Sequence, residues 1–239
     1  IGENRAFKTG FLESVERDAI MGFYLKKMKG KKMFDFPDKI SNLINYLNRY
    51  QLETHVFDAT TDLGIPSIFA LTLDYTGLGE AVNVGSSSDL NYEKAIEKSI
   101  TESIQCRRIG RVSKEFLNAR SIDESEINSL ETRLIYWRDL SRIENVCHLI
   151  EEAPKISYKK ISRKKISLEN AIRNVSSKGF NILVTDITLP EIKRNGFETL
   201  KIVIPELHPL YLDEGAKSLY SVHYGEIKDD PTLKPHPVT

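Results

Sequence analysis

Two glutamates near the start of the chain have a spacing suited to binding a metal ion and phosphate. Glu13 and Glu16 lie three residues apart, and Arg17 follows directly. On a helix, residues three apart share a face, so the two carboxylates would lie side by side. Their mutual repulsion calls for a counter-charge, and Mg²⁺ is a natural one because it takes oxygen ligands and works with substrate phosphates. Thr9, one helical turn before Glu13, extends the same face.

A second polar helix face repeats this order further along the chain. The segment from Glu102 to Gln105 again reads Glu-Ser-aliphatic-Glu/Gln, and Arg107 follows two residues later. Two such helices predict one site at which a metal ion and a polyanion bind between them. Each helix by itself is explained as well by an ordinary solvated face, so spacing alone leaves both interpretations open.

The segments that must position these residues show a mixture of helical and strand patterns. Apolar residues at three- and four-residue steps predict helices over 7–28, 37–50, 91–108, 121–140 and 167–178. Runs rich in β-branched and aliphatic residues predict strands over 52–60, 67–75, 80–88, 181–189 and 199–207. We expect a capping box at Ser121-x-x-Glu124 and a loop over 153–166. The expected class is α+β, as one domain over 1–239 with a proline-bearing tail over 208–239.

Composition excludes several classes of function. The 239 residues carry 34 basic and 34 acidic side chains, so a formal net charge of zero gives no whole-chain attraction to nucleic acid or to an anionic membrane. Two cysteines are too few for a disulfide framework or a four-cysteine zinc site. No apolar run approaches the ~20 residues that span a bilayer. We expect a cytoplasmic protein because no signal segment precedes the first helix, and we expect a longer or processed parent chain because residue 1 is Ile.

Two stretches resemble motif regions of the YcaO family. ENRAFKTGFLESVERDA, over 3–19, carries an ExxER-type helix, and GLGEAVNVGSSSDLNYEKAIEKSITESIQCRR, over 77–108, carries an ALxExxQxR-type helix after a glycine-bearing strand. The combination is specific, and the order of the remaining segments is similar. The resemblance implies a YcaO-type α+β fold. It also implies that the chain is the C-terminal portion of such a protein, with part of the nucleotide site contributed from outside it.

The resemblance implies ATP-dependent activation of a peptide backbone amide. A nucleophile adds to the amide carbon, the resulting oxyanion attacks the γ-phosphate of ATP, and phosphate then leaves. An external sulfide source as nucleophile yields a thioamide, and a neighbouring Cys, Ser or Thr yields an azoline. Phosphoryl transfer of this kind depends mainly on positioning and charge neutralisation.

Site residues follow from the resemblance by position. It implies that Glu13, Glu16 and Glu102 bind Mg²⁺ and ATP. Contacts to the nucleotide or its phosphates come from the remaining polar residues of the two motifs, which are Thr9, Arg17, Gln105 and Arg107.

Three functions remain open from the sequence. Cyclodehydratases of the family often end in a PxPxP-like tail that reaches the active site, whereas this chain ends Pro235-His236-Pro237-Val238-Thr239 and lacks the last proline. This departure favours thioamidation over azoline formation. A non-catalytic peptide-binding scaffold is the third alternative, and the clustered carboxylates argue against it. The resemblance further implies a peptide or protein substrate and a partner protein that presents it or delivers sulfur, and we carry a homodimer as an assembly to be tested.

Overall fold

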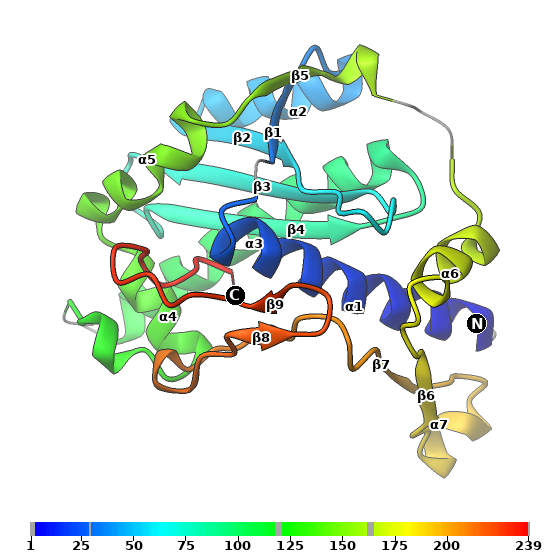
Figure 1. Cartoon of the computed structure of the whole chain (residues 1–239). Coiled ribbons are helices and arrows are strands. Elements are labelled where there is room, and N and C mark those ends of the chain that lie inside the picture. The colour runs from blue at the N-terminus through cyan, green and yellow to red at the C-terminus, as the bar shows by residue number, and fades with distance from the viewer. Residues whose placement is uncertain (1–2, 29, 118–120, 162–164, 239) are drawn as a thin grey trace.

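The computed structural model describes residues 3–28, 30–117, 121–161 and 165–238 and centres on a five-stranded sheet (Figure 1). The helices are α1 (Glu3–Leu25), α2 (Asp38–Asn48), α3 (Tyr92–Leu117), α4 (Leu130–Trp137), α5 (Glu144–Glu151), α6 (Leu168–Ser176) and α7 (Pro190–Arg194). The strands are β1 (Lys31–Phe34), β2 (Leu52–Asp58), β3 (Ser67–Asp74), β4 (Val82–Ser88), β5 (Lys155–Ser157), β6 (Leu183–Asp186), β7 (Leu200–Val203), β8 (Tyr220–Ser221) and β9 (Gly225–Glu226). Short 3₁₀ helices span Glu124–Glu126, Leu140–Ile143, Tyr158–Lys160 and Glu214–Ala216.

The central sheet has the strand order β4-β3-β2-β1-β5. Neighbouring strands are antiparallel except for the β1–β5 pair, which is parallel. This arrangement confirms the expected α+β class. Strand β4 forms one end of the sheet, so one of its backbone edges faces away from β3.

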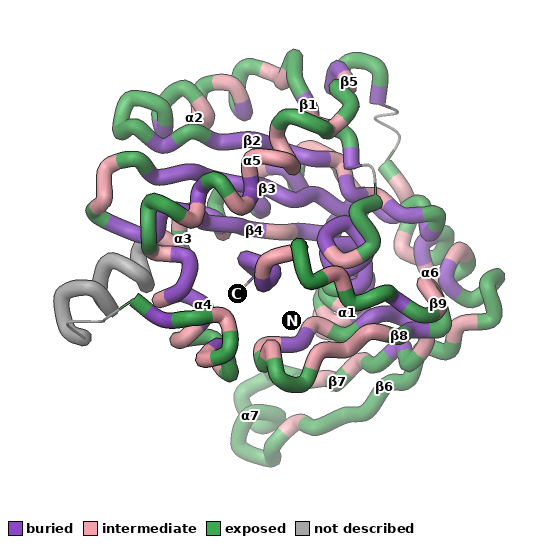
Figure 2. Tube along the Cα trace, turned by 60° about the vertical axis from the view of Figure 1, so that its left-hand side comes forward, coloured by how far each residue is buried: buried purple, intermediate pink, exposed green. Residues whose placement is uncertain are grey.

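Alternation along the strands divides the core into two layers. Phe69 and Leu71 of β3 pack in the layer that also receives Phe23 of α1, whereas Ile68 and Ala70 pack in the layer that receives Ile100 of α3. Successive side chains of a strand point to opposite faces, so α1 and α3 cover opposite faces of the same sheet. Figure 2 shows the buried strands β2, β3 and β4 between these layers.

Three details of the secondary structure differ from the sequence predictions. The expected helix over 121–140 begins only at Leu130, because the Ser129 side chain accepts a hydrogen bond from Thr132 N and caps the helix there. The expected loop over 153–166 contains β5, a strand of three residues that is too short to show a period. Strand β1 was missed because two of its four residues are lysines.

The C-terminal third adds small elements around this core. Strands β6 and β7, with α7 between them in the chain, form a separate two-stranded antiparallel sheet, most of whose residues are exposed. The tail from residue 208 carries the short β8–β9 hairpin and returns to α1 (Figure 1). Within the described ranges, no helix is both long and apolar enough to cross a lipid bilayer.

Candidate active site

A cleft of about 900 Å³ lies where α1 and α3 meet the free edge of β4. Both helices contribute polar side chains, β4 contributes its serine-rich end, and the tail contributes two apolar side chains. The lining residues are Arg5, Lys8, Thr9, Leu12, Glu13, Glu16, Arg17, Ile20, Ser86, Ser87, Ser88, Asp89, Lys94, Glu97, Lys98, Thr101, Glu102, Gln105, Leu210 and Val238.

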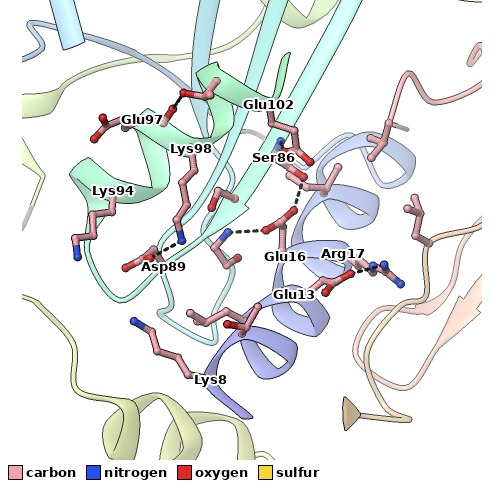
Figure 3. Close-up of a pocket in the computed structure, with 18 of the residues that line it drawn as sticks. Lys8, Glu13, Glu16, Arg17, Ser86, Asp89, Lys94, Glu97, Lys98 and Glu102 are labelled. Carbon is pink, nitrogen blue, oxygen red and sulfur yellow. Dashed lines mark hydrogen bonds and ion pairs between the residues drawn. The ribbon is translucent and has the colours of Figure 1, made fainter. Parts of the chain in front are cut away.

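The free edge of β4 supplies hydrogen-bond donors to carboxylates from both helices. The backbone N–H of Ser86 donates to Oε2 of Glu102 at 2.6 Å. The Ser86 hydroxyl donates to Oε1 of Glu16 at 2.6 Å, and the Ser88 N–H donates to Oε2 of Glu16 at 3.0 Å. Edge N–H groups need acceptors because no further strand pairs with them. The two glutamates meet this need and are thereby fixed beside each other (Figure 3).

The carboxylates in the cleft repel one another. Burial raises the pKa of Glu102 to about 7, with the charges of Glu16 and Glu13 adding to the effect against the hydrogen bond from Ser86. Burial also raises the pKa of Glu16, and the charge of Glu13 contributes in the same direction. Desolvated like charges of this kind are stabilised by a nearby cation.

The opposite end of the cleft is basic. Lys8 of α1 and Lys94 of α3 line it, and neither forms an ion pair with another residue in the part of the chain that the structure describes. Lys98 is held by Asp89, with Nζ 3.0 Å from Oδ2. Figure 3 shows these lysines on the side of the cleft away from Glu13 and Arg17. The cleft therefore has a carboxylate end suited to a metal ion and a basic end suited to an anion.

Most of the predicted site residues come together here. Thr9, Glu13, Glu16, Arg17, Glu102 and Gln105 all line the cleft. The guanidinium of Arg17 pairs with Glu13 one turn earlier on α1. The Thr9 hydroxyl donates to the carbonyl of Arg5 within the same helix.

Arg107 does not join the cleft lining, so its expected phosphate contact lacks a geometric basis in this structure. Its Nε donates to Oδ2 of the buried Asp74 at 2.7 Å. Arg107 lies five residues after Glu102, and five residues turn a helix by about 140° beyond one full turn. Its side chain therefore leaves α3 on a different face.

The metal-binding prediction fits an open site. Among residues 3–28, 30–117, 121–161 and 165–238, no group of three or more His, Cys, Asp or Glu side chains could hold a metal ion by itself. Mg²⁺ in nucleotide sites usually has one or two carboxylates, water and substrate phosphates as ligands. Glu13, Glu16 and Glu102 supply oxygen donors of this kind beside an anion-binding end. The raised pKa values of Glu16 and Glu102 indicate that a cation would be favoured there.

Several functional residues escaped the sequence prediction. The hydrogen bonds of Ser86 and Ser88 to the glutamates depend on β4 being an edge strand, which no local sequence pattern indicates. Lys8 and Lys94 lie within the two motif stretches but outside the ExxER-type and ALxExxQxR-type patterns, so nothing in the sequence singled them out. His236 is fully buried in the tail and lies outside the cleft lining, with Nε2 2.8 Å from the carbonyl oxygen of Tyr211.

The sequence matches the family model for YcaO cyclodehydratase, described as ATP- and Mg²⁺-binding, over residues 3–208. The chain belongs to the YcaO family. The match includes both glutamate-bearing helices and β4, so it covers the polar part of the cleft. A search of curated proteins found no match.

The YcaO fold is also evident from similarity to solved structures. They include a heterocyclase in complex with substrate and cofactor (TM-score 0.67, 20% identity), the heterocyclase TruD (0.66, 21%) and YcaO from Methanopyrus kandleri bound with AMPPCP and Mg²⁺ (0.64, 16%). The alignments cover 87%, 100% and 95% of this chain and 27%, 33% and 56% of those chains, respectively. The chain thus spans from about a quarter to just over half of these relatives, and at such low identity the similarity establishes the fold alone.

Proposed function

We propose that the cleft binds ATP with Mg²⁺ and that the protein uses it to phosphorylate the oxygen of a peptide backbone amide. The observation that carries the proposal is the position of Glu16 and Glu102, which both accept hydrogen bonds from the edge of β4. At the other end of the same cleft lie Lys8 and Lys94, which form no ion pair among the described residues. The matched family description, ATP- and Mg²⁺-binding, supports the choice of ligand.

The residues of the cleft have distinct roles in this reaction. Glu13, Glu16 and Glu102 would hold Mg²⁺, which supplies charge neutralisation at the phosphates when bound. Ser86 and Ser88 keep the carboxylates of Glu16 and Glu102 in place. Lys8 and Lys94 attract the polyphosphate. These contacts align the γ-phosphate with the incoming amide oxygen, which is the main requirement of phosphoryl transfer.

The proposed reaction proceeds by addition, phosphorylation and elimination. A nucleophile adds to the amide carbon and moves the carbonyl electron pair onto oxygen. That oxygen bonds to the γ-phosphorus, and ADP leaves. Departure of phosphate then breaks the carbon–oxygen bond. If sulfide was the nucleophile, its remaining S–H proton is lost as the C=S bond of a thioamide forms. If the nucleophile was a neighbouring hydroxyl or thiol of the peptide, which lost its proton on addition, the amide N–H proton is lost as the C=N bond of an azoline forms.

Azoline formation now has the stronger support of the two products. The tail lacks the last proline of the PxPxP-like pattern, which favours thioamidation. The tail nevertheless reaches the cleft, as in cyclodehydratases with that pattern, because Val238 is one of the lining residues. The family model that the chain matches is also described as that of a cyclodehydratase. A partner protein that presents the peptide or delivers sulfur remains part of the proposal, as does a homodimer.

Nucleotide binding tests the site directly. Glu16→Gln removes one charge and keeps the side-chain size, so the affinity for Mg²⁺·AMPPCP measured by calorimetry should fall by about a hundredfold or more. Glu93→Gln is the matched control, because Glu93 lies on α3 outside the cleft lining and its loss should change affinity by less than about twofold. Wild-type affinity in Glu16→Gln would reject the site.

Mass spectrometry of a modified peptide separates the products. Loss of one water identifies an azoline, and replacement of oxygen by sulfur identifies a thioamide. Tight peptide binding with no mass change and no ATP consumption would instead support the scaffold alternative.

A further inference from the structure

The C-terminal end of the tail forms part of the wall of the cleft. Val238 and Leu210 both line it. Val238 is only 7% exposed and belongs to the same apolar cluster as Ile20 of α1. Residues 234–238 form no helix or strand, so they hold such a position only if other contacts tie their backbone to the body of the protein and offset the entropy lost on ordering them.

Arg133 of α4 provides the strongest of these ties. Its side chain is completely buried. Nη1 donates to the carbonyl oxygen of His236 at 2.6 Å, and Nη2 donates to the carbonyl oxygen of Leu212 at 2.7 Å and to Oε1 of Glu214 at 2.7 Å. One rigid guanidinium therefore joins two parts of the tail that are more than twenty residues apart in sequence.

Contacts of the tail end with the body of the protein other than that of Arg133 are longer or more exposed, and the buried His236 ring, with Nε2 2.8 Å from the carbonyl oxygen of Tyr211, makes its contact within the tail itself. The Tyr24 hydroxyl approaches the carbonyl oxygens of Lys234 and Pro235 at 3.1 and 3.3 Å. Lys234 pairs with Glu124, but both side chains are more than one-third exposed. Exposed pairs contribute little to stability, whereas charge-assisted hydrogen bonds in the interior are stronger and more directional.

We propose that Arg133 is a positioning residue of the nucleotide cleft, which holds the tail end so that Val238 closes one wall. The two carbonyl groups that Arg133 binds flank the part of the tail between Leu212 and His236. Val238 follows His236 by only two residues. Loss of the hydrogen bond from Arg133 to His236 therefore releases Val238 from its position in the cleft lining. The link to nucleotide rests on the proposed function, whereas the link between Arg133 and the tail rests on the hydrogen bonds alone.

The test needs a variant that removes the tie without leaving a buried charge. Arg133→Met alone would strand Glu214, whose side chain is 8% exposed. We therefore choose Arg133→Met combined with Glu214→Gln. Lys217→Met is the matched control, since Lys217 lies 3.9 Å from the other carboxylate oxygen of Glu214, pairs with Asp229 and forms no ion pair with residues 234–238 in the described chain. Trp137 is the single tryptophan and lies in the core, so its emission reports folding.

Hydrogen exchange of the full-length protein provides the first readout. In the double variant, the amides of His236 and Val238 should exchange at least about tenfold faster than in the wild type, while Trp137 emission is unchanged. Lys217→Met should leave these rates within about twofold. Unchanged exchange in the double variant would overturn the proposal. If that variant fails to fold, Arg133→Lys serves instead, because lysine keeps the charge but cannot reproduce the guanidinium fork and should give an intermediate increase.

Affinity for Mg²⁺·AMPPCP provides the second readout. The double variant should bind about fivefold more weakly or worse, and a chain truncated after Lys234 should show the same loss. Combining truncation with the double variant should cause no further loss, because both remove the same wall. Additive losses of affinity would mean that Arg133 acts through general stability. Faster amide exchange with unchanged affinity would mean that the tail end is no part of the site. Either result overturns the proposal. Absence of binding in the wild type would reject the proposed function, and tail exchange would still decide the role of Arg133.

Discussion

At the scale of single residues, identical carboxyl groups behave differently because their surroundings differ. Glu16 and Glu102 accept hydrogen bonds from the edge of β4 and lie in an open cleft, where a cation can approach. Glu80 lies in the core at 1% exposure, and its Oε1 has no hydrogen-bond partner among the described residues. Burial raises the pKa of Glu80 to about 9, against a smaller opposing effect of Arg138. Glu80 is therefore protonated and neutral in the folded protein at pH 7.

Because Glu80 is protonated, we expect Glu80→Gln to increase the free energy of unfolding by an amount that depends on pH. The folded-state pKa lies above the unfolded value, so the wild type has its full stability below about pH 4.5 and loses part of it as the pH rises toward 9. Glutamine removes this loss. The difference in unfolding free energy between variant and wild type should grow by about 3 kcal/mol from pH 4.5 to pH 7. Chemical unfolding across this pH range measures the difference in unfolding free energy. Glu131→Gln on the exposed surface serves as the control. A difference that does not vary with pH would refute a protonated Glu80.

At the scale of elements, the site depends on how closely α3 packs against β4. Gly85 faces α3, and a Cβ atom there would lie 2.1 Å from the Ser99 carbonyl oxygen and 2.4 Å from the Ser103 backbone nitrogen. No side chain fits, so glycine at this position sets the distance between helix and strand. The adjacent Ser86 can then reach Glu102 with its N–H.

Gly85→Ala should disturb both stability and the site. Because the clash is with backbone and not with a flexible side chain, α3 must shift away from β4, and we expect a loss of about 1–3 kcal/mol in unfolding free energy. Nucleotide affinity should fall in the folded variant, because Glu102 moves from Ser86. Thermal unfolding and calorimetry measure the two effects. In the control Gly215→Ala, the new Cβ meets only the Asp213 side chain at 3.1 Å, and a similar loss in both variants would contradict this account.

At the scale of the whole molecule, the tail is joined to the N-terminal helix through buried polar contacts. His223, between β8 and β9, has Nδ1 2.8 Å from Oδ2 of Asp18 on α1 and Nε2 2.8 Å from Oδ1 of Asp62. The Tyr224 hydroxyl donates to Asp18 as well. Burial alone would lower the pKa of His223, but the hydrogen bonds and charges of Asp18 and Asp62 outweigh it and raise this pKa. A protonated ring can donate to both carboxylates at once, whereas a neutral ring can donate to only one.

His223→Gln should therefore destabilise the protein more at low pH than at high pH. Since the folded-state pKa is raised, the histidine contributes its full stabilisation below its ordinary value of 6.5 and loses it as the pH rises through the folded value. The fall in melting temperature should be larger at pH 6 than at pH 9. The control is His148→Gln on α5, where we expect no such trend, and equal losses at both pH values would exclude a charged His223.

The sequence determined the helices that carry Glu13, Glu16, Glu102 and Gln105, because a three-residue spacing places two side chains on one helical face whatever surrounds the helix. It also determined strands β2, β3 and β4, because their runs of apolar and β-branched residues are typical of buried strands. The motif resemblance was likewise evident from the sequence, and the family match confirmed it. Pairs of residues close in sequence were thus predictable from local geometry.

Only the tertiary structure decided which distant groups meet. The roles of Ser86 and Ser88 depend on the strand order, because only an edge strand has N–H groups free for Glu16 and Glu102. The side chain of Arg107 pairs with Asp74 instead of lining the cleft, because its position on α3 faces another part of the sheet. Arg133 and Val238 carry no motif, and their link to the cleft exists only because the tail folds back across α1 and α4. Contacts between residues so far apart arise from packing of the whole chain, which local sequence patterns do not encode.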